Sequence, residues 1–156
     1  MNGSDIMVTL PGFIDESTRM CILVKIEPRG KGRPRAFVNK ATGRADAHPD
    51  KQSTDWEKAF QILALAAERR LADQIKMIAG RPLFVHLTLQ YTKPKTAQWF
   101  CTKPIDNDNA EKLVWDAMQG HFFLNDNRIV ANFTTKTWAE GEPRIIINIA
   151  ALKEFP

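Results

Sequence analysis

The chain has 156 residues, of which 44% are hydrophobic and 26% charged, a composition ordinary for one globular domain with its own core. Its apolar stretches are too short to cross a bilayer and its first residues do not read as an export signal, so we expect a cytoplasmic protein without a membrane partner. The net charge of +4 is too small to name a polyanionic partner by itself, and two cysteines suggest no disulfide framework.

A strongly basic loop follows the first predicted strand. The strand covers residues 21–26 (CILVKI), and the next residues, EPRGKGRPR, contain prolines and glycines that interrupt regular structure. The basic residues between positions 25 and 44 are Lys25, Arg29, Lys31, Arg33, Arg35, Lys40 and Arg44. Only one acid, Glu27, stands among them, so this segment concentrates positive potential more than the net charge suggests.

The middle of the chain predicts a long helix and a buried strand. We expect the helix from about Thr54 to about Ile78, begun by a capping box of Thr54 and Glu57 and continued by apolar residues at helical spacing. An Arg-Pro pair ends it, and the β-forming run at 82–92 follows as a strand. Residues 93–104 are polar and bounded by prolines, which predicts a loop.

The last third of the chain predicts a second helix and two strands. The helix runs from Asn109 to Gln119, and Gly120 is well placed as its C-terminal cap. Residues 128–138 and 143–152 then read as two strands of an antiparallel hairpin, joined by the short turn AEGE.

These elements follow the order β-α-β-α-β-β. The economical arrangement is an α+β fold, in which a mixed sheet of about four strands has two main helices packed on it. We expect one domain over residues 1–156. Residues 36–38 can add a short strand, and residues 1–18 form either an extra strand or a loose tail.

Two aspartates stand side by side at the start of the second helix, in KPIDNDNAEK. Asp108 with Glu111 makes a capping box, and acids near a helix N-terminus are favoured by the helix dipole. Asp106 lies outside the predicted helix, so capping does not explain it. One of the two acids therefore calls for another role.

A third carboxylate, Asp126, immediately precedes the next strand. The predicted helix rises about 16 Å, and an extended return to residue 125 covers up to about 20 Å. Asp126 can therefore come back beside Asp106 and Asp108. Carboxylates this close raise one another's pKa unless a cation lies between them, and Mg²⁺ is a hard ion that prefers such oxygen ligands. The three histidines lack the spacing of a zinc site.

Other polar residues near these acids keep two interpretations. Lys112 and Asp116 lie on the polar side of the helix, where they continue the line of Asp108 as a solvated chain of i, i+4 ion pairs or as part of a site. Lys136, late in a strand, either faces the site or points to solvent.

Aromatic residues nearby also fit two roles. Trp99 and Phe100, in the polar loop, are candidates for stacking on unpaired bases. Phe122 and Phe123 are further candidates, although core packing is favoured for Phe123.

Residues 103 to about 130 resemble the RusA family of Holliday-junction resolvases. The shared pattern is a basic lead-in with proline, D-x-D-N, a lysine four residues after the second aspartate, an Asp-Ala pair, and a Gly-aromatic stretch that ends in an acidic pair. This chain carries the pattern as Lys103-Pro104, Asp106 to Asn109, Lys112, Asp116-Ala117, Gly120 to Phe123, and Asn125-Asp126. It departs from the family at Asn125, where an aspartate is common, and at Ile105, which is basic in some members.

The resemblance implies that Asp106, Asp108 and Asp126 bind a divalent metal and that Lys112 is the basic residue needed at the scissile phosphate. The DNA-binding residues suggested with it are Lys31, Arg33, Arg35 and Lys103. It further implies a RusA-like fold and a homodimer that nicks four-way DNA junctions symmetrically, with Mg²⁺ or Mn²⁺, in recombination and repair.

Two other functions fit the same residues. A non-catalytic DNA-binding module would use the basic loop at 25–44 and leave the aspartates to cap and solvate a helix. A metal-dependent hydrolase of small nucleotides would use the acids without needing the basic loop.

Overall fold

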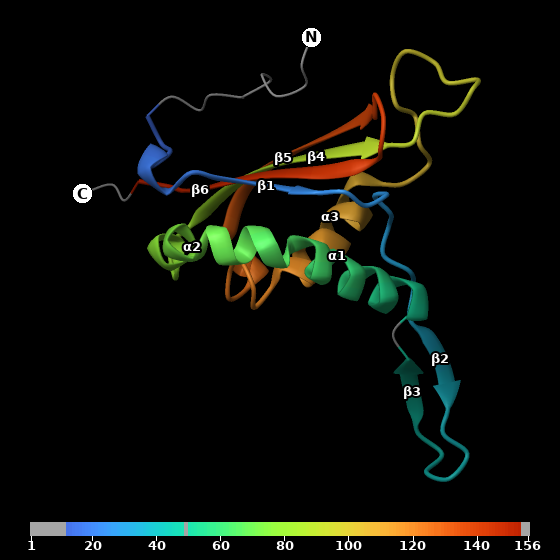
Figure 1. Cartoon of the computed structure of the whole chain (residues 1–156). Coiled ribbons are helices and arrows are strands. Elements are labelled where there is room, and N and C mark those ends of the chain that lie inside the picture. Colours follow the sequence, from blue (N-terminus) through green and yellow to red (C-terminus); the bar gives the residue numbers. More distant parts are fainter. Residues whose placement is uncertain (1–11, 49, 154–156) are drawn as a thin grey trace.

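The computed structural model describes residues 12–48 and 50–153, and it contains a mixed four-stranded sheet with helices on one face (Figure 1). The strands lie in the order β1 (Met20–Val24), β6 (Arg144–Ala151), β4 (Leu83–Tyr91) and β5 (Ile129–Trp138). Strand β6 is antiparallel to both neighbours, whereas β4 and β5 are parallel. The predicted α+β class and the mixed sheet of four strands are confirmed.

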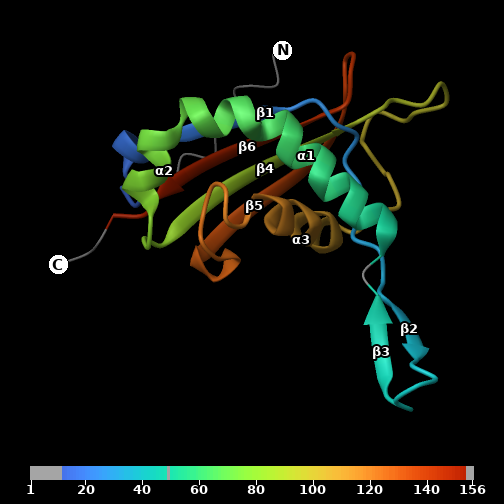
Figure 2. The same ribbon diagram turned by 60° about the horizontal axis from the view of Figure 1, so that its bottom comes forward.

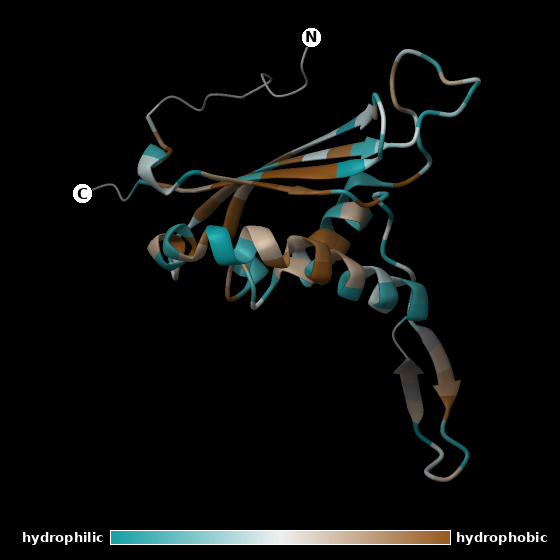
Figure 3. Ribbon diagram, viewed as in Figure 1, coloured by the Kyte–Doolittle hydropathy of each residue, from teal (hydrophilic) through white to brown (hydrophobic). Residues whose placement is uncertain are grey.

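The core lies between the sheet and the helices. In β4, alternate residues such as Val85, Leu87 and Leu89 are fully buried, and β6 adds Ile145 and Ile147 in the same layer. Successive side chains of a strand point to opposite faces, so this alternation fixes which face the helices cover. Figure 3 shows hydrophobic residues along the central strands and on parts of the helices that lie against them.

The long helix predicted in the middle of the chain is divided in two. Helix α1 (Lys51–Arg70) ends at Leu71, and the shorter α2 (Ala72–Ile78) follows in a new direction (Figure 2). Neither proline nor glycine marks the break, which is why the apolar spacing predicts one continuous helix.

The start of α1 is also earlier than predicted. Asp50 is its N-cap, and its carboxylate accepts a hydrogen bond from the backbone N–H of Ser53 at 2.9 Å. The expected capping box of Thr54 and Glu57 is therefore wrong, because both residues already lie within the helix. An aspartate accepting from the third helical N–H satisfies the same orphan donor that a capping box would.

Helix α3 (Asn107–Met118) connects the parallel strands β4 and β5 as the crossover of a β-α-β unit. Gly120, with φ of 81°, follows its end and confirms the predicted C-terminal glycine. The antiparallel hairpin expected from the last two strands is wrong, since β4 lies between β5 and β6. Every residue of β4 except Gln90 is buried, as expected for a strand in the middle of a sheet.

A separate two-stranded hairpin projects from the body of the protein (Figure 1). It consists of β2 (Arg35–Val38) and β3 (Ala45–His48), with Gly43 at φ of 65° in the turn. The short strand predicted at 36–38 is one arm of it. This hairpin makes a fifth and a sixth strand outside the main sheet.

The beginning of the chain is described in part. Residues 1–11 of the expected tail lie outside the described residues, while Ile14 forms an isolated bridge with Leu152, and Glu16–Thr18 form a short 3₁₀ helix, η1. Cys21 and Cys101 are free thiols. Within the described ranges, no helix has the length and apolar character that crossing a membrane requires.

Candidate active site

The first turn of α3 presents two carboxylates. Asp106 occupies the N-cap position, yet its side chain makes no capping hydrogen bond, and Asp108 lies in the first turn. The predicted capping box of Asp108 and Glu111 is wrong, because the helix begins at Asn107 rather than Asn109. Both aspartates are exposed, and the helix dipole favours negative charge at this end. Their carboxylates are thus held in place by the helix without being used to cap it.

Lys112 lies one turn further along the same exposed side of α3. Its Nζ is 3.4 Å from Oδ2 of Asp108, and the two side chains are 64% and 71% exposed. Such an exposed pair contributes little to stability. Lys112 is therefore free to exchange this partner for another anion.

Lys136 fastens the segment that leads into these aspartates. Its Nζ donates hydrogen bonds to the carbonyl oxygens of Lys103, at 3.3 Å, and Ile105, at 2.9 Å. In the sheet Lys136 is opposite Leu89, whose side chain is buried on the face covered by helices. Of the two interpretations left open by the sequence, the structure supports the one in which Lys136 faces the site.

The basic loop after β1 packs directly against α3. The backbone N–H of Lys31 donates to the carbonyl of Asn109 at 3.1 Å, and the Nζ of Lys31 forms an ion pair with Asp116. A Cβ on Gly30 would stand 3.2 Å from Cγ2 of Ile105, so glycine permits this close approach. Asp116 is therefore paired with Lys31 and does not extend an i, i+4 chain from Lys112.

Glu57 of α1 adds a third charge to this contact. Burial raises the pKa of Glu57, the negative charge of Asp116 raises it further, and Lys31 opposes both effects. The basic loop, α1 and α3 consequently meet around one lysine and two acids. This contact fixes the loop beside the site through charges that come from three separate elements.

The other predicted DNA-binding residues lie along the same loop or next to Asp106. Arg33 is exposed, and Arg35 begins β2. Lys103 lies 3.6 Å from Oε1 of Glu27, with its Nζ 5.6 Å from the centre of the Tyr91 ring. Burial raises the pKa of Tyr91 well above its usual value, which keeps the phenol neutral. Of these cations, Lys31 contacts α3 itself and Lys103 lies three residues before Asp106.

Asp126 lies apart from the other two aspartates within one chain. It begins the short 3₁₀ helix η2 (Asp126–Arg128), just before β5, whereas Lys136 and the Asp106 segment meet near the end of that strand. Lys136 is seven residue steps along the strand from Ile129, or about 23 Å at roughly 3.3 Å per step. Over the described ranges, no three acidic, histidine or cysteine side chains come close enough to hold an ion.

The expected return of the chain fails because the turn after α3 is compact. The N–H of Gly120 donates to the carbonyl of Phe123 at 2.7 Å, and Gln119 and Phe123 form an isolated bridge. In an extended conformation, residues 120–125 could have run back along the length of α3, but several of them form this turn instead. Asp126 consequently stays at the C-terminal end of α3, about 18 Å of helix away from Asp106.

The four aromatic residues near the acids divide into two pairs. Phe122 and Phe123 are 1% and 7% exposed and belong to the core, as favoured for Phe123. Trp99 and Phe100 are 91% and 76% exposed in the loop between β4 and α3. Only the second pair is accessible to a ligand.

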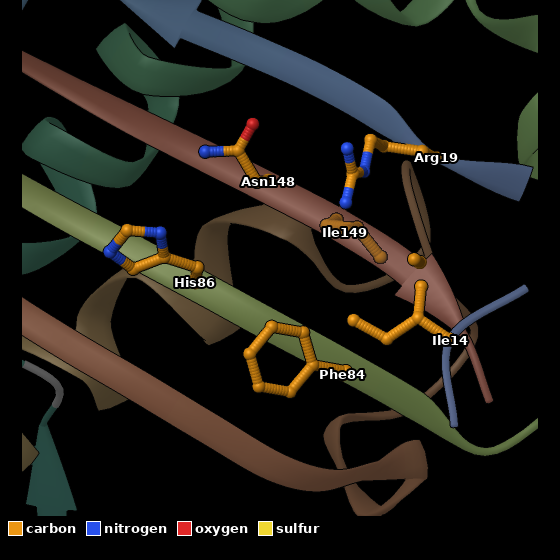
Figure 4. A pocket seen from close by; sticks show the side chains of 7 residues that line it. Ile14, Arg19, Phe84, His86, Asn148 and Ile149 are labelled. Carbon is orange, nitrogen blue, oxygen red and sulfur yellow. The ribbon is translucent and has the colours of Figure 1, made fainter. Parts of the chain in front are cut away.

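A small pocket lies on the opposite face of the sheet (Figure 4). Its lining includes Phe84, His86 and Asn148, and burial lowers the pKa of His86. Its volume of about 20 Å³ is that of a single water site, and none of its lining residues is a carboxylate. This pocket is unsuited to a nucleotide or to the metal expected at α3.

The sequence of the chain matches the model of a known family. The family model described as Endodeoxyribonuclease RusA matches residues 25–150 of the chain, from the end of β1 to β6. The matched range includes α3, the basic loop, Asp126 and Lys136. A search of curated proteins finds no match.

Proposed function

The chain belongs to the RusA family of endodeoxyribonucleases, which resolve Holliday junctions, and from this we propose that it is a Mg²⁺-dependent homodimer that cuts four-way DNA junctions by paired symmetric nicks. The proposed setting is recombination and repair in the cytoplasm, with Mn²⁺ able to replace Mg²⁺. The observation that carries this proposal is the exposed pair Asp106 and Asp108 at the start of α3, next to the basic loop.

The carboxylates of α3 suit a hard divalent cation. Mg²⁺ is commonly held by one or two protein carboxylates, with waters and phosphate oxygens completing its shell. Asp106 and Asp108 offer exposed oxygens on a rigid helix end, and Lys136 fastens the backbone just before them. When bound, the metal lowers the pKa of a water and offsets charge on the leaving oxygen.

The cations around α3 would handle the DNA backbone. When Asp108 serves as a ligand, its contact with Lys112 is given up, and the amine is left to stabilise charge on the phosphate under attack. Arg33 and Lys103 would hold flanking phosphates. Lys31 would do so less directly, since its amine is already paired with Asp116.

The position of Asp126 gives the dimer a role in this chemistry. We infer that Asp126 acts as a ligand for the metal of a second protomer. Strand β5 lies at the edge of the main sheet, with Asp126 just before its first residue and Lys136 near its last. Two β5 strands placed antiparallel about a two-fold axis would bring the beginning of one beside the end of the other. Each site would then draw Asp106 and Asp108 from one chain and Asp126 from the other.

Mixed dimers test this arrangement. Asp108→Asn and Asp126→Asn, each alone, should abolish cleavage of a synthetic four-way junction in Mg²⁺ while junction binding persists. Co-expression of the two variants should restore about a quarter of the wild-type nicking, because half of the dimers are mixed and each contains one intact site. Asp73→Asn, on an exposed acid of α2, is the matched control.

Each alternative has its own result. Mixed dimers that stay inactive would mean that Asp126 does not act across subunits. If the wild type binds junctions equally well with and without Mg²⁺ and cuts them in neither case, the non-catalytic DNA-binding module is favoured. Cleavage of free nucleotides with no preference for junctions would favour the small-nucleotide hydrolase.

A further inference from the structure

Two adjacent aromatic side chains in the loop between β4 and α3 have no packing role in the protomer. Trp99 is 91% exposed and Phe100 is 76% exposed, whereas other aromatic residues such as Trp56, Phe60 and Phe122 are buried. Leaving two large apolar rings in water forgoes the burial that stabilises such residues elsewhere. Two adjacent rings with this exposure indicate a surface that a ligand covers.

The loop that carries these rings is anchored at both ends and in the middle. Glu27 accepts a hydrogen bond from the Thr92 hydroxyl at 2.6 Å and pairs with Lys103 at 3.6 Å, so one carboxylate ties the two ends together. The indole N–H of Trp138 donates to the carbonyl of Gln98 at 2.9 Å, directly before Trp99. These contacts hold the loop in place, and the loop projects beyond the end of the sheet (Figure 1).

The charge around the rings favours nucleic acid over a protein surface. Residues 92–104 contain three lysines, Lys93, Lys95 and Lys103, and no acid. A second copy of the same loop would repel this one, whereas a phosphate backbone is attracted to it. Aromatic rings beside lysines are the combination that binds unpaired bases, with the rings stacking on bases and the cations holding phosphates.

We propose that Trp99 and Phe100 form a stacking platform for bases that are unpaired at the branch point of a bound four-way junction. The platform rests on the proposed function and extends it, because it explains how a junction is distinguished from a continuous duplex, whose bases are already stacked. The same loop ends three residues after Lys103 at Asp106, so bases held on the platform lie on the strand segment that approaches the acids.

The experiment compares binding to a four-way junction and to a linear duplex of the same sequence, in EDTA so that nothing is cut. Trp99→Ala with Phe100→Ala should lower junction affinity by about tenfold or more, whereas duplex affinity changes by less than about twofold. Trp99→Phe retains a ring and should keep most of the junction affinity. Ile62→Ala, on a 73% exposed residue of α1, controls for loss of an exposed apolar side chain.

A fluorescent 2-aminopurine at the branch point gives the direct readout. Its emission should be quenched by wild type and by Trp99→Phe, and not by the double alanine variant. Equal junction affinity of wild type and double variant would overturn the platform, and so would conversion of the variant to a monomer, which would make the rings a subunit contact. A wild type that neither prefers nor cuts junctions would instead refute the proposed function itself.

Discussion

Replacing Lys136 by methionine should damage both the stability and the metal use of this protein. The Nζ of Lys136 donates to two carbonyls, those of Lys103 and Ile105, in the segment that enters α3. Methionine keeps the length and apolar character of the side chain and removes the ammonium. The change therefore isolates two charge-assisted hydrogen bonds from the packing of the stem.

The size of the effect follows from the burial of this contact. Hydrogen bonds from a charged group contribute about 1.5–3 kcal/mol each when buried, and Lys136 is half-buried and one bond is long at 3.3 Å. We expect the free energy of unfolding to fall by about 2 kcal/mol in total, which lowers the melting temperature of a chain of this size by about 4–8 °C. Because Asp106 follows the released segment directly, the Mg²⁺ concentration for half-maximal cleavage should rise about tenfold.

The assay pairs thermal unfolding with single-turnover junction cleavage across a Mg²⁺ titration. Lys112→Met is the matched control, since that amine is exposed and its pairing with Asp108 contributes below about 0.5 kcal/mol. Lys112→Met should have the melting temperature of the wild type and should lose cleavage at all Mg²⁺ concentrations, so that added Mg²⁺ does not restore it. A Lys136→Met protein that melts with the wild type and has an unchanged Mg²⁺ requirement would refute the anchoring role.

Two further predictions concern stability. Burial lowers the pKa of His86 below that in the unfolded chain, so its stabilising contribution is full above about pH 6.5 and is lost as the pH falls through the lower folded value. Melting curves from about pH 7.5 to about pH 5 should show this loss in the wild type and a weaker pH dependence in His86→Gln. Melting temperatures that fall equally with pH in both proteins would contradict it. Gly32→Ala would place a Cβ 2.2 Å from Oδ2 of Asp50, the N-cap of α1, and should cost about 1–3 kcal/mol in urea unfolding, whereas Gly141→Ala, with open space around it, should have little effect.

Local patterns predicted most of the secondary structure. The apolar run of β6, the apolar spacing of α3 and the glycine after it each depend on neighbours in sequence, and all three predictions hold. The break at Leu71 escaped because nothing in the local sequence opposes a continuous helix. Helix caps differed by a few residues for the same reason, since Asp50 and Thr54 are both acceptable N-caps.

Contacts between distant segments were harder to predict. The partner of β5 is β4, 46 residues earlier, rather than the adjacent strand β6, because the buried β4 takes the centre of the sheet. Asp116 pairs with Lys31 from a loop 85 residues away, although Lys112 is one turn from it. Periodicity carries no information on which segments meet. Spacing and resemblance therefore suggested candidate residues for the site, but they predicted neither the electrostatic partners of these residues nor the separation of Asp126 from Asp106.

The separation of Asp126 from Asp106 changes what a single protomer can do. If the site needs all three carboxylates, one chain alone holds two of them at one end of α3 and the third about 18 Å of helix away. Under the proposed function, such a protomer would be inert until it dimerised, and its two complete sites would form together, related by the same two-fold axis. Symmetric placement of both cuts would follow from the assembly itself, because neither site exists without the partner that completes the other.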